Sequence, residues 1–328
     1  MGDLENRLAN LTPEKREALA NILKSRAGAG TQKNQPSAAA TAPAMAQTAP
    51  AETYLKEDLL TGDAADIPVE SEARKASWKS FYDKVSAQLN GNVFGQFSFF
   101  LNYGYVPDGQ LEFSAVSLPE HYINKNSVKL VLEVIQDCPV EGKRVLDVGC
   151  GRGGTIHVFK TFFKPSRVVG LDLSTNAIEF CRQAHKDPRV TFHEGDAENL
   201  PFEDGSFDIV TNLESSHSYP RIHRFYSEVF RVLAPGGHFL YTDALTSQQI
   251  TSSIAYLRHI GFELERDRDI TSNVLLSCNE IANTRVQAFD SRNDSGLMEN
   301  FLATPGSDVY QAMKSNLLVY RILKLRKQ

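Results

Sequence analysis

The sequence predicts an α/β fold in which helices cover both faces of a mostly parallel sheet. Short apolar runs rich in β-branched residues alternate with helix-like segments from about residue 143 onward. This alternation is typical of a parallel sheet with helices on its two faces. The 328 residues are 41% apolar, so the chain can bury one large core or two small ones.

Seven strand-like runs make up the predicted sheet. The first five are KRVLDVG, RVVGLDL, RVTFHEG, FDIVTNL and GHFLYTD, and the last two are FELERDRDI and NLLVYRILKL. The final run alternates more clearly than the others, which is typical of an antiparallel strand beside the parallel ones.

Helices are expected before and between these runs. The segment ESEARKASWKSFYDKVSAQL reads as an amphipathic helix, with Trp78, Tyr82 and Val85 on one side. A second helix is expected at about 121–138, and a helical insert at about 272–315 precedes the last strand.

The N-terminal part differs in composition from the rest. Residues 10–25 carry a helix-start pattern, with Thr12 as the cap and Pro13 at the first helical position. Because a short helix is unstable alone, its apolar stripe predicts a docking surface within residues 1–26, with an expendable tail as the alternative. Residues 27–60 begin with an Ala- and Pro-rich stretch and are expected to be a flexible linker.

Composition and charge argue against several classes of protein. The net charge is −5 and the Lys and Arg residues are scattered, whereas nucleic-acid binders usually show a basic patch. No apolar run reaches the length of a membrane span, and the first residues do not read as a secretory signal. The four cysteines are widely spaced and fit no zinc pattern, which favours reduced thiols and a cytoplasmic location.

The stretch VLDVGCGRGG is the strongest functional signal in the chain. A buried strand runs directly into Gly149, Cys150 and Gly151. Ligands bind at this turn in doubly wound sheets, and glycine leaves room for a ligand against the backbone. Read literally, the stretch also satisfies the dinucleotide fingerprint G-x-G-x-x-G, so NAD and S-adenosylmethionine compete as cofactors.

Acidic residues lie near three strand ends, and two of them favour S-adenosylmethionine. Asp147 lies two residues before the first glycine, where a carboxylate suits a cationic amino acid and sits poorly beside a pyrophosphate. Asp172 ends the second strand and can accept hydrogen bonds from ribose hydroxyls, which both cofactors need. Asp196 follows the third strand, where it can accept from an adenine amino group.

Residues from about 95 to 328 resemble the class I S-adenosylmethionine-dependent methyltransferases. The motifs VLDVGCGRGG, LPFEDGSFDIV and RVLAPGGHFLYTD carry the resemblance through their order and spacing. The stretches LNYGYV and NLESSHSYP look like the small-molecule methyltransferases of lipid and polyketide–peptide pathways, such as the phthiotriol dimycocerosate methyltransferases. One departure is GCGRGG, where many members have GCGTGG or GCGPGG. The resemblance implies a Rossmann-like methyltransferase domain over residues 61–328, with the insert covering the acceptor pocket.

The resemblance also implies which residues hold the cofactor. The aspartates, with the residues around them, would meet in chain order the methionine end, the ribose and the adenine. Asn212 and Leu213 would lie beside the sulfonium through their backbone, and Tyr103 would lie in an N-terminal lid. The implied set is Tyr103, Asp147, Gly149, Cys150, Gly151, Asp172, Leu173, Asp196, Ala197, Asn212 and Leu213.

A histidine just after the fourth strand is the expected catalytic residue. His217 lies at the carboxyl edge of the sheet, where the methyl group of the cofactor should point. A hydroxyl acceptor is a poor nucleophile until its proton leaves, and histidine is suited to take that proton. Glu214 either orients the imidazole or caps the helix that begins near Pro220. Asp243 ends the fifth strand and either faces the substrate or caps a helix.

These observations predict O-methylation of a hydroxyl on a polyketide, peptide–polyketide or lipid-like small molecule, free or tethered to a carrier protein. The alternatives are C-methylation of a sterol- or quinone-like carbon and, from the glycines alone, NAD-dependent oxidoreduction. No convincing set of carboxylates suggests a metal, so metal independence is expected. The segment 1–26 resembles the LTPEKR segments at domain junctions of peptide and polyketide synthases, which implies docking to such a synthase.

Overall fold

The structure is a computed structural model that describes residues 68–91, 95, 98–108, 116–286 and 295–328. The helix expected at 10–25, the docking segment 1–26 and the linker 27–60 lie outside these residues. The division of the chain at those boundaries stays a prediction.

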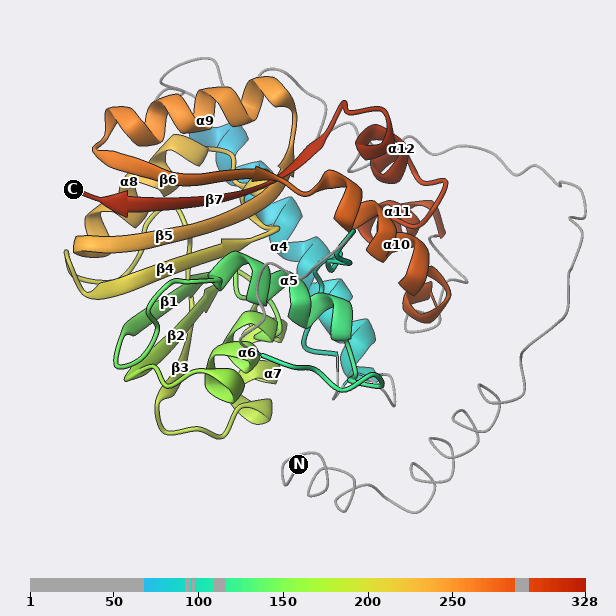
Figure 1. Cartoon of the computed structure of the whole chain (residues 1–328), viewed down its shortest axis with the longest axis horizontal. Helices are drawn as coiled ribbons and strands as arrows, with labels where there is room; N and C mark the ends of the chain where they lie inside the picture. The colour runs from blue at the N-terminus through green and yellow to red at the C-terminus, as the bar shows by residue number, and fades with distance from the viewer. Residues whose placement is uncertain (1–67, 92–94, 96–97, 109–115, 287–294) are drawn as a thin grey trace, which may run out of the picture. The chain divides into compact units, whose positions relative to one another are not determined.

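Seven strands form one sheet in the order β3-β2-β1-β4-β5-β7-β6, as Figure 1 shows. The first five strands pair in parallel, and β7 pairs antiparallel with both β5 and β6. The strands are β1 (Arg144–Val148), β2 (Arg167–Asp172), β3 (Val190–Glu194), β4 (Phe207–Leu213), β5 (Leu233–Leu245), β6 (Phe262–Asp269) and β7 (Val319–Lys327). Every predicted strand is present, which confirms the α/β fold class and the antiparallel last strand.

Helices lie between the strands and before the first of them (Figure 1). Those before and among the parallel strands are α4 (Pro68–Gly91), α5 (Lys125–Ile135), α6 (Gly154–Phe162), α7 (Thr175–Ala184), the short 3-10 helix η3 (Ser216–Ser218) and α8 (Ile222–Val232). Those that follow β5 are α9 (Ser247–His259), α10 (Thr271–Val286), α11 (Ser295–Phe301) and α12 (Asp308–Lys314). The helix expected at 121–138 is therefore shorter at both ends, and the expected insert contains α10, α11 and α12.

Alternate residues of each central strand enter two different cores, because successive strand side chains point to opposite faces. Val145 packs with α5 and α6 in the core on one face, whereas its neighbour Leu146 packs with α8 and α9 on the other. Ile209 and Val210 of β4 divide in the same way. Both faces of the sheet are thus covered by apolar helix surfaces, as the alternation of apolar runs predicts.

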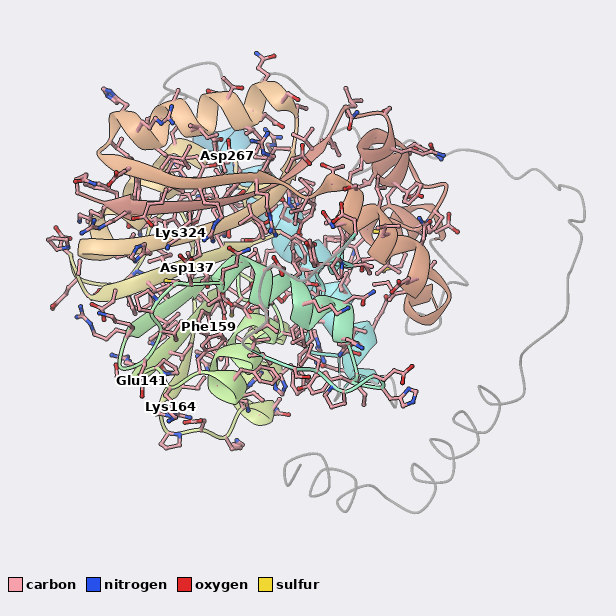
Figure 2. All side chains as sticks on the ribbon, viewed as in Figure 1. Asp137, Glu141, Phe159, Lys164, Asp267 and Lys324 are labelled. Atoms are coloured by element: carbon pink, nitrogen blue, oxygen red, sulfur yellow. The ribbon has the colours of Figure 1, made fainter. Side chains whose placement is uncertain are left out.

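The strand β7 is held in register by a buried cation as well as by its two neighbours. Lys324 is only 9% exposed at its side chain and pairs with Asp137 and with Glu265 of β6, at 3.3 Å in each case. Figure 2 shows Lys324 and Asp137 on the ribbon. A one-residue slip of β7 would turn Lys324 to the other face of the sheet, so these ion pairs favour the observed register.

Candidate active site

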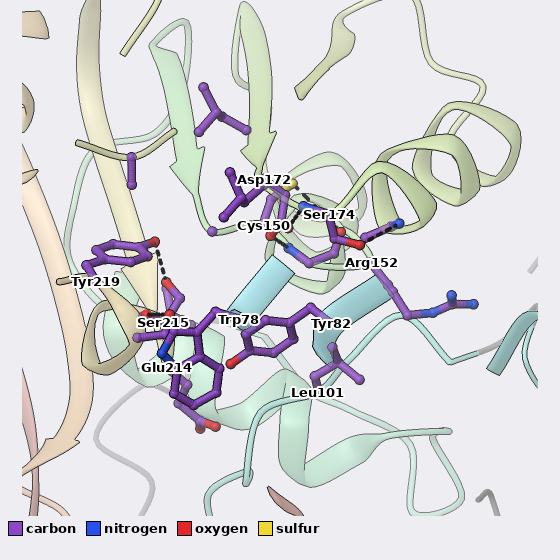
Figure 3. Close-up of a pocket in the computed structure, with 18 of the residues that line it drawn as sticks. Trp78, Tyr82, Leu101, Cys150, Arg152, Asp172, Ser174, Glu214, Ser215 and Tyr219 are labelled. Carbon is purple, nitrogen blue, oxygen red and sulfur yellow. Dashed lines mark hydrogen bonds between the residues drawn. The ribbon is translucent and has the colours of Figure 1, made fainter. Parts of the chain in front are cut away.

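A cavity opens at the carboxyl ends of the parallel strands, where α/β sheets bind ligands. Its floor comes from the loops after β1, β2, β3 and β4, and α4 and the segment 99–103 close it from the other side. Figure 3 shows Asp172, Glu214 and Tyr82 from these different segments around one space. The predicted site residues that line it are Tyr103, Gly149, Cys150, Gly151, Asp172, Leu173, Asp196, Ala197, Leu213, Glu214 and His217.

The glycine loop after β1 has a backbone that only glycine adopts without strain. Gly149 has a φ of 70° and Gly151 a φ of 50°, in the left-handed region. A Cβ at Gly149 would lie 2.2 Å from Oγ of Ser215 and 2.6 Å from the hydroxyl of Tyr219. The loop therefore combines an unusual backbone conformation with very close packing against the segment after β4.

Asp172 joins the second strand end to the glycine loop. Its carboxylate accepts a hydrogen bond from the backbone N–H of Gly151 at 2.7 Å and another from that of Ser174 at 2.8 Å. Burial raises its pKa, although both backbone donors act to lower it. Because Asp172 also lines the cavity beside Leu173, its oxygens remain placed to accept from hydroxyls of a ligand.

Asp196 occupies the corresponding position after β3. One carboxylate oxygen accepts from the backbone N–H of Glu198 at 2.8 Å, and the other lies 2.6 Å from the ammonium of Lys75 on α4. Ala197 lines the cavity next to it. The acidic residue expected at the adenine end is thus present and oriented, and it is paired with a cation that sequence reasoning missed.

Asp147 and Asn212 do not line the cavity. Asp147 is 1% exposed and accepts from the hydroxyl of Thr211 at 2.7 Å, and burial raises its pKa to about 7. The side-chain amide of Asn212 donates to the carbonyl of Val148 at 2.9 Å and to Oγ of Ser215 at 2.7 Å. The structure therefore gives both residues places beneath the site, and the direct cofactor contacts expected of them remain predictions.

Glu214 is held by the segment around Tyr103 and by strand β7. Its φ of 49° is unusual for a residue with a side chain. Its carboxylate accepts from the backbone N–H of Tyr103 at 2.8 Å and from the hydroxyl of Tyr320 on β7. The expected alternative is that Glu214 caps α8. The residue at the N-terminal cap of α8 is Arg221, and its side chain makes no capping hydrogen bond. Glu214 thus ties the segment around Tyr103 and strand β7 to the cavity wall.

His217 is oriented by Asp243, which differs from the partner expected for it. The imidazole Nδ1 lies 2.8 Å from one oxygen of Asp243, and the backbone N–H of His217 donates to the other oxygen at 3.0 Å. Ser216 donates to the same carboxylate at 2.7 Å. Asp243 is 1% exposed at the end of β5 and holds the imidazole through Nδ1, whereas the orienting role expected of Glu214 stays a prediction.

An aromatic wall made by α4 and α11 lies against His217 in the cavity. The ring of Trp78 lies 6.1 Å from the imidazole centroid and stacks on Tyr82 at 5.8 Å. Phe301 of α11 packs edge-on against Tyr82 at 6.2 Å. The spacing of Trp78 and Tyr82 on an amphipathic helix was visible in the sequence, but this pattern is more often found in a core than around a ligand.

Arg152, the residue that departs from the usual motif in GCGRGG, has a role that the sequence did not indicate. It lines the cavity and is 0% exposed. Its guanidinium donates to the carbonyls of Ser98 and Gly95 at 2.7 Å each, and to the side-chain oxygen of Asn90 on α4 at 2.8 Å. Arg152 thereby fastens the glycine loop to the segment that closes the cavity.

These residues fit S-adenosylmethionine. The glycine loop lets a ligand approach the backbone, Asp172 and Asp196 offer acceptors at two strand ends, and Glu214 adds a third acidic side chain to the wall. Such a set suits a ligand that carries hydroxyls, an amino-bearing base and positive charge. Within the described ranges, no group of three or more His, Cys, Asp or Glu side chains is arranged to hold a metal ion. Nor does any described helix have the length and apolarity to cross a membrane.

The fold and the site define an S-adenosylmethionine-dependent methyltransferase, and the chain belongs to this family. A family model described as a methyltransferase domain matches residues 146–241. The fatty-acid O-methyltransferase of Mycolicibacterium smegmatis is 36% identical over 225 residues, which cover 68% of this chain and 81% of that protein. The phthiotriol/phenolphthiotriol dimycocerosates methyltransferase of Mycobacterium tuberculosis is 30% identical, over 76% of this chain and 91% of that protein. This membership sets aside the NAD-dependent alternative.

Solved structures support the fold at lower identity. The [4+2]-cyclase SpnF superposes with a TM-score of 0.57 at 22% identity, over 76% of this chain and 94% of that one. A geranyl diphosphate methyltransferase in complex with sinefungin superposes with a TM-score of 0.56 at 16% identity, over 78% and 100%. One of these neighbours is described as a cyclase, so the reaction has to be argued from the site.

Proposed function

We propose that this enzyme methylates a hydroxyl oxygen of a lipid-like small molecule and that His217 is the general base. The observation that carries the proposal is the pair formed by His217 and Asp243, of which the histidine lines the cavity at the carboxyl edge of the sheet. Methyl transfer needs an aligned acceptor, and a hydroxyl acceptor also needs a group that removes its proton.

The hydrogen bonds around Asp243 support one tautomer of His217. The carboxylate accepts from Ser216, from the backbone of His217 and from the backbone of Ala244 at 2.8 Å. An ionised carboxylate only accepts, so Nδ1 of His217 carries the proton and Nε2 carries the lone pair. Nε2 is then the atom that takes the proton of the acceptor hydroxyl, and Asp243 stabilises the resulting imidazolium.

The cofactor side is assigned to the strand-end residues. When bound, S-adenosylmethionine supplies a methyl group on a sulfonium, which is an excellent leaving group. The glycine loop would receive its amino-acid part, while Asp172 would accept from the ribose hydroxyls and Asp196 from the adenine. Leu213 and Glu214 line the wall between these residues and His217. Alignment of the two reactants can be worth roughly 7–11 kcal/mol, so these contacts contribute to rate as well as to affinity.

Two features support a neutral, apolar acceptor. The wall beside His217 consists of Trp78, Tyr82 and Phe301, which suits an apolar body. The carboxylates of Glu214 and Asp243 lie on the histidine side, so a negatively charged acceptor would be repelled. Both relatives described above are named for lipid-like acceptors. The triol named for one of them carries hydroxyls and fits both the wall and the charge, whereas the fatty acid named for the other fits only the apolar wall.

The remaining alternatives concern the methylated atom and the setting. A carbon acceptor also needs a base, so His217 alone does not separate O-methylation from C-methylation. A polyketide or peptide acceptor, tethering to a carrier protein, docking through residues 1–26 and a cytoplasmic location stay predictions. Identification of the methylated product tests whether the acceptor is a polyketide or a peptide. Deletion of residues 1–55 tests the docking.

Labelled S-adenosylmethionine tests the proposal with two matched probes. Dodecanol presents a hydroxyl, whereas dodecanoic acid presents a carboxylate that is already ionised at neutral pH. We expect label in the ether of dodecanol and a loss of about 10²–10⁴ in turnover for His217→Ala with this probe, with S-adenosylmethionine affinity nearly unchanged. Mass spectrometry and calorimetry make the two measurements. An unaltered turnover in His217→Ala would contradict the assignment of His217 as the general base. Label found only in the ester of dodecanoic acid would show that the acceptor is a carboxylate and not a hydroxyl.

A further inference from the structure

The helix α4 presents one face to the whole length of the cavity. The residues on it that line the cavity are Lys75, Trp78, Tyr82 and Ser86. Their spacing of three and four residues places them on the same side of an α-helix. Lys75 lies at the end of the cavity assigned to adenine, and Trp78 faces His217. A single rigid element therefore reaches both the cofactor side and the acceptor side.

Lys75 makes the charged contacts of this face. Its ammonium lies 2.6 Å from a carboxylate oxygen of Asp196 and 2.6 Å from one of Glu198, and its side chain is 9% exposed. Burial acts to lower its pKa, but the hydrogen bonds with Asp196 and Glu198 outweigh it and leave the pKa raised. Lys75 is thus a charged, nearly buried cation held by the residue expected to accept from adenine.

The same network continues to the histidine loop. Glu198 is 1% exposed and also accepts from the backbone N–H of Arg221 at 2.6 Å and from its Nε at 2.8 Å. Arg221 directly follows the segment that contains His217 and precedes α8. The adenine end, α4 and the loop of the proposed base therefore share one buried carboxylate.

A bound cofactor would strengthen the contact of Lys75 with Asp196. The side chain of Asp196 is 32% exposed without a ligand, so water still screens this ion pair. A base placed over Asp196 would exclude that water and lower the local dielectric constant, which strengthens the attraction between the two charges. The helix would be held more firmly, and Trp78 and Tyr82 would be held with it.

We propose that Lys75 is a positioning residue through which cofactor binding fastens α4 over the acceptor site. The acceptor side of this inference rests on the function proposed above. Because coupling between two sites is reciprocal, the acceptor in turn tightens the cofactor site. Lys75 itself touches neither reacting atom, and it acts through Asp196 on the cofactor side and through Trp78, one turn further along α4, on the acceptor side.

The chain contains a single tryptophan, Trp78, so its fluorescence reports on α4 alone. S-adenosylhomocysteine is the probe, and its binding is measured by calorimetry. In the wild type we expect saturation to reduce acrylamide quenching of Trp78 and to slow amide hydrogen exchange in α4 by about fivefold or more. In Lys75→Met, saturation should leave both signals within about twofold of the ligand-free protein. Lys84→Met is the matched control, because Lys84 is exposed on the same helix, and it should behave as the wild type.

Two outcomes overturn the proposal. One is a wild type in which S-adenosylhomocysteine leaves α4 unprotected, and the other is full protection in Lys75→Met. Where the Met variant does not reach saturation, Lys75→Arg decides, because it should restore affinity and protection together. Affinity restored without protection contradicts the proposal. His217→Ala should keep the protection, so a failure of the base assignment leaves this test intact.

Discussion

The pair of His217 and Asp243 shows how a buried carboxylate orients a single side chain. Asp243 accepts three hydrogen bonds besides that of the imidazole, two of them from backbone N–H groups. These donors fix the carboxylate before any ligand binds, and the carboxylate fixes the ring. The orientation of the imidazole is thus a property of the fold around β5.

Replacement of Asp243 by Asn tests this dependence. The amide can donate to Nδ1, which would move the imidazole proton to Nε2 and remove the base. We expect turnover to fall by about 10²–10⁴, with little change in S-adenosylhomocysteine affinity by calorimetry. Asp204→Asn, on the exposed surface, is the control. A variant that keeps its turnover would show that the tautomer does not matter.

Asp147 makes a second prediction, about stability. Its pKa of about 7 lies above the ordinary value of about 3.9, so the folded protein binds more protons than the unfolded chain between these pH values. The free energy of unfolding therefore falls as pH rises through this window. Asp147→Asn should remove this fall, so the free energy of unfolding of the variant relative to the wild type should rise by about 4 kcal/mol from pH 4 to pH 8, measured by urea unfolding. An equal difference at both pH values would contradict the raised pKa.

The acidic residues of the cofactor side could be predicted from the sequence because each lies at or next to a strand end. Parallel strands bring such positions to one edge, so local pattern is enough for Asp172 and Asp196. The partners that act on them come from far along the chain. Lys75 is separated from Asp196 by 121 residues and His217 from Asp243 by 26, and the single sequence carries no signal for such pairing.

Among the elements, the glycine loop depends on a residue that departs from the common family motif. Arg152 takes the place of a smaller residue in GCGRGG and lies over the ring of Phe180, with its guanidinium carbon 3.5 Å from the ring centroid. Its hydrogen bonds reach α4 and the segment around Gly95. Arg152 therefore links the glycine loop directly to the segments that close the cavity.

Removal of this guanidinium should loosen both. Arg152→Met would leave buried carbonyls without donors, at about 1–3 kcal/mol for each group that water cannot reach. We expect the free energy of unfolding to fall by about 2–4 kcal/mol and S-adenosylhomocysteine to bind more weakly. Arg152→Lys keeps the charge and should recover part of the loss. Urea unfolding measures the stability and calorimetry the affinity. An unchanged affinity in a destabilised Met variant would show that the contacts of Arg152 with the cavity wall do not affect ligand binding by the glycine loop.

The aromatic wall illustrates why an element can be predicted while its role is not. The four-residue spacing of Trp78 and Tyr82 places both on one side of α4, as observed. Whether that side faces a core or a cavity depends on the elements opposite it, here the loop of His217 and the helix α11 that contributes Phe301. These belong to distant parts of the chain, and their approach is decided by tertiary packing.

For the whole molecule, the order of the strands predicts how truncation acts. The last strand, β7, lies between β5 and β6. A chain that ends at Leu318 lacks β7 and therefore loses the backbone hydrogen bonds of β7 with β5 and with β6. We expect such a chain to show no cooperative unfolding transition and no S-adenosylhomocysteine binding. Deletion of residues 1–55 should by contrast preserve both. Circular dichroism and calorimetry of the two shortened chains make the comparison, and a folded chain without β7 would contradict the inferred importance of that strand.

The fold could be predicted more completely than the site. Apolar runs and their order are local properties that determine the strands, and the clear alternation of NLLVYRILKL indicated an antiparallel partner. The position of β7 inside the sheet is not local, because it depends on contacts such as that of Lys324 with Asp137 after α5. The sequence predicted which elements form, and long-range packing decides where β7 inserts.

The insertion of β7 between two strands that precede it in the chain has a consequence for synthesis. Until the ribosome has released β7, β5 has an open edge and β6 lacks its partner in the sheet. Because nascent chains fold as units and open strand edges promote association, the emergence of β7 from the exit tunnel becomes the step that permits native assembly. A pause or premature stop before the codons of β7 would leave an aggregation-prone intermediate, even with every catalytic side chain already made.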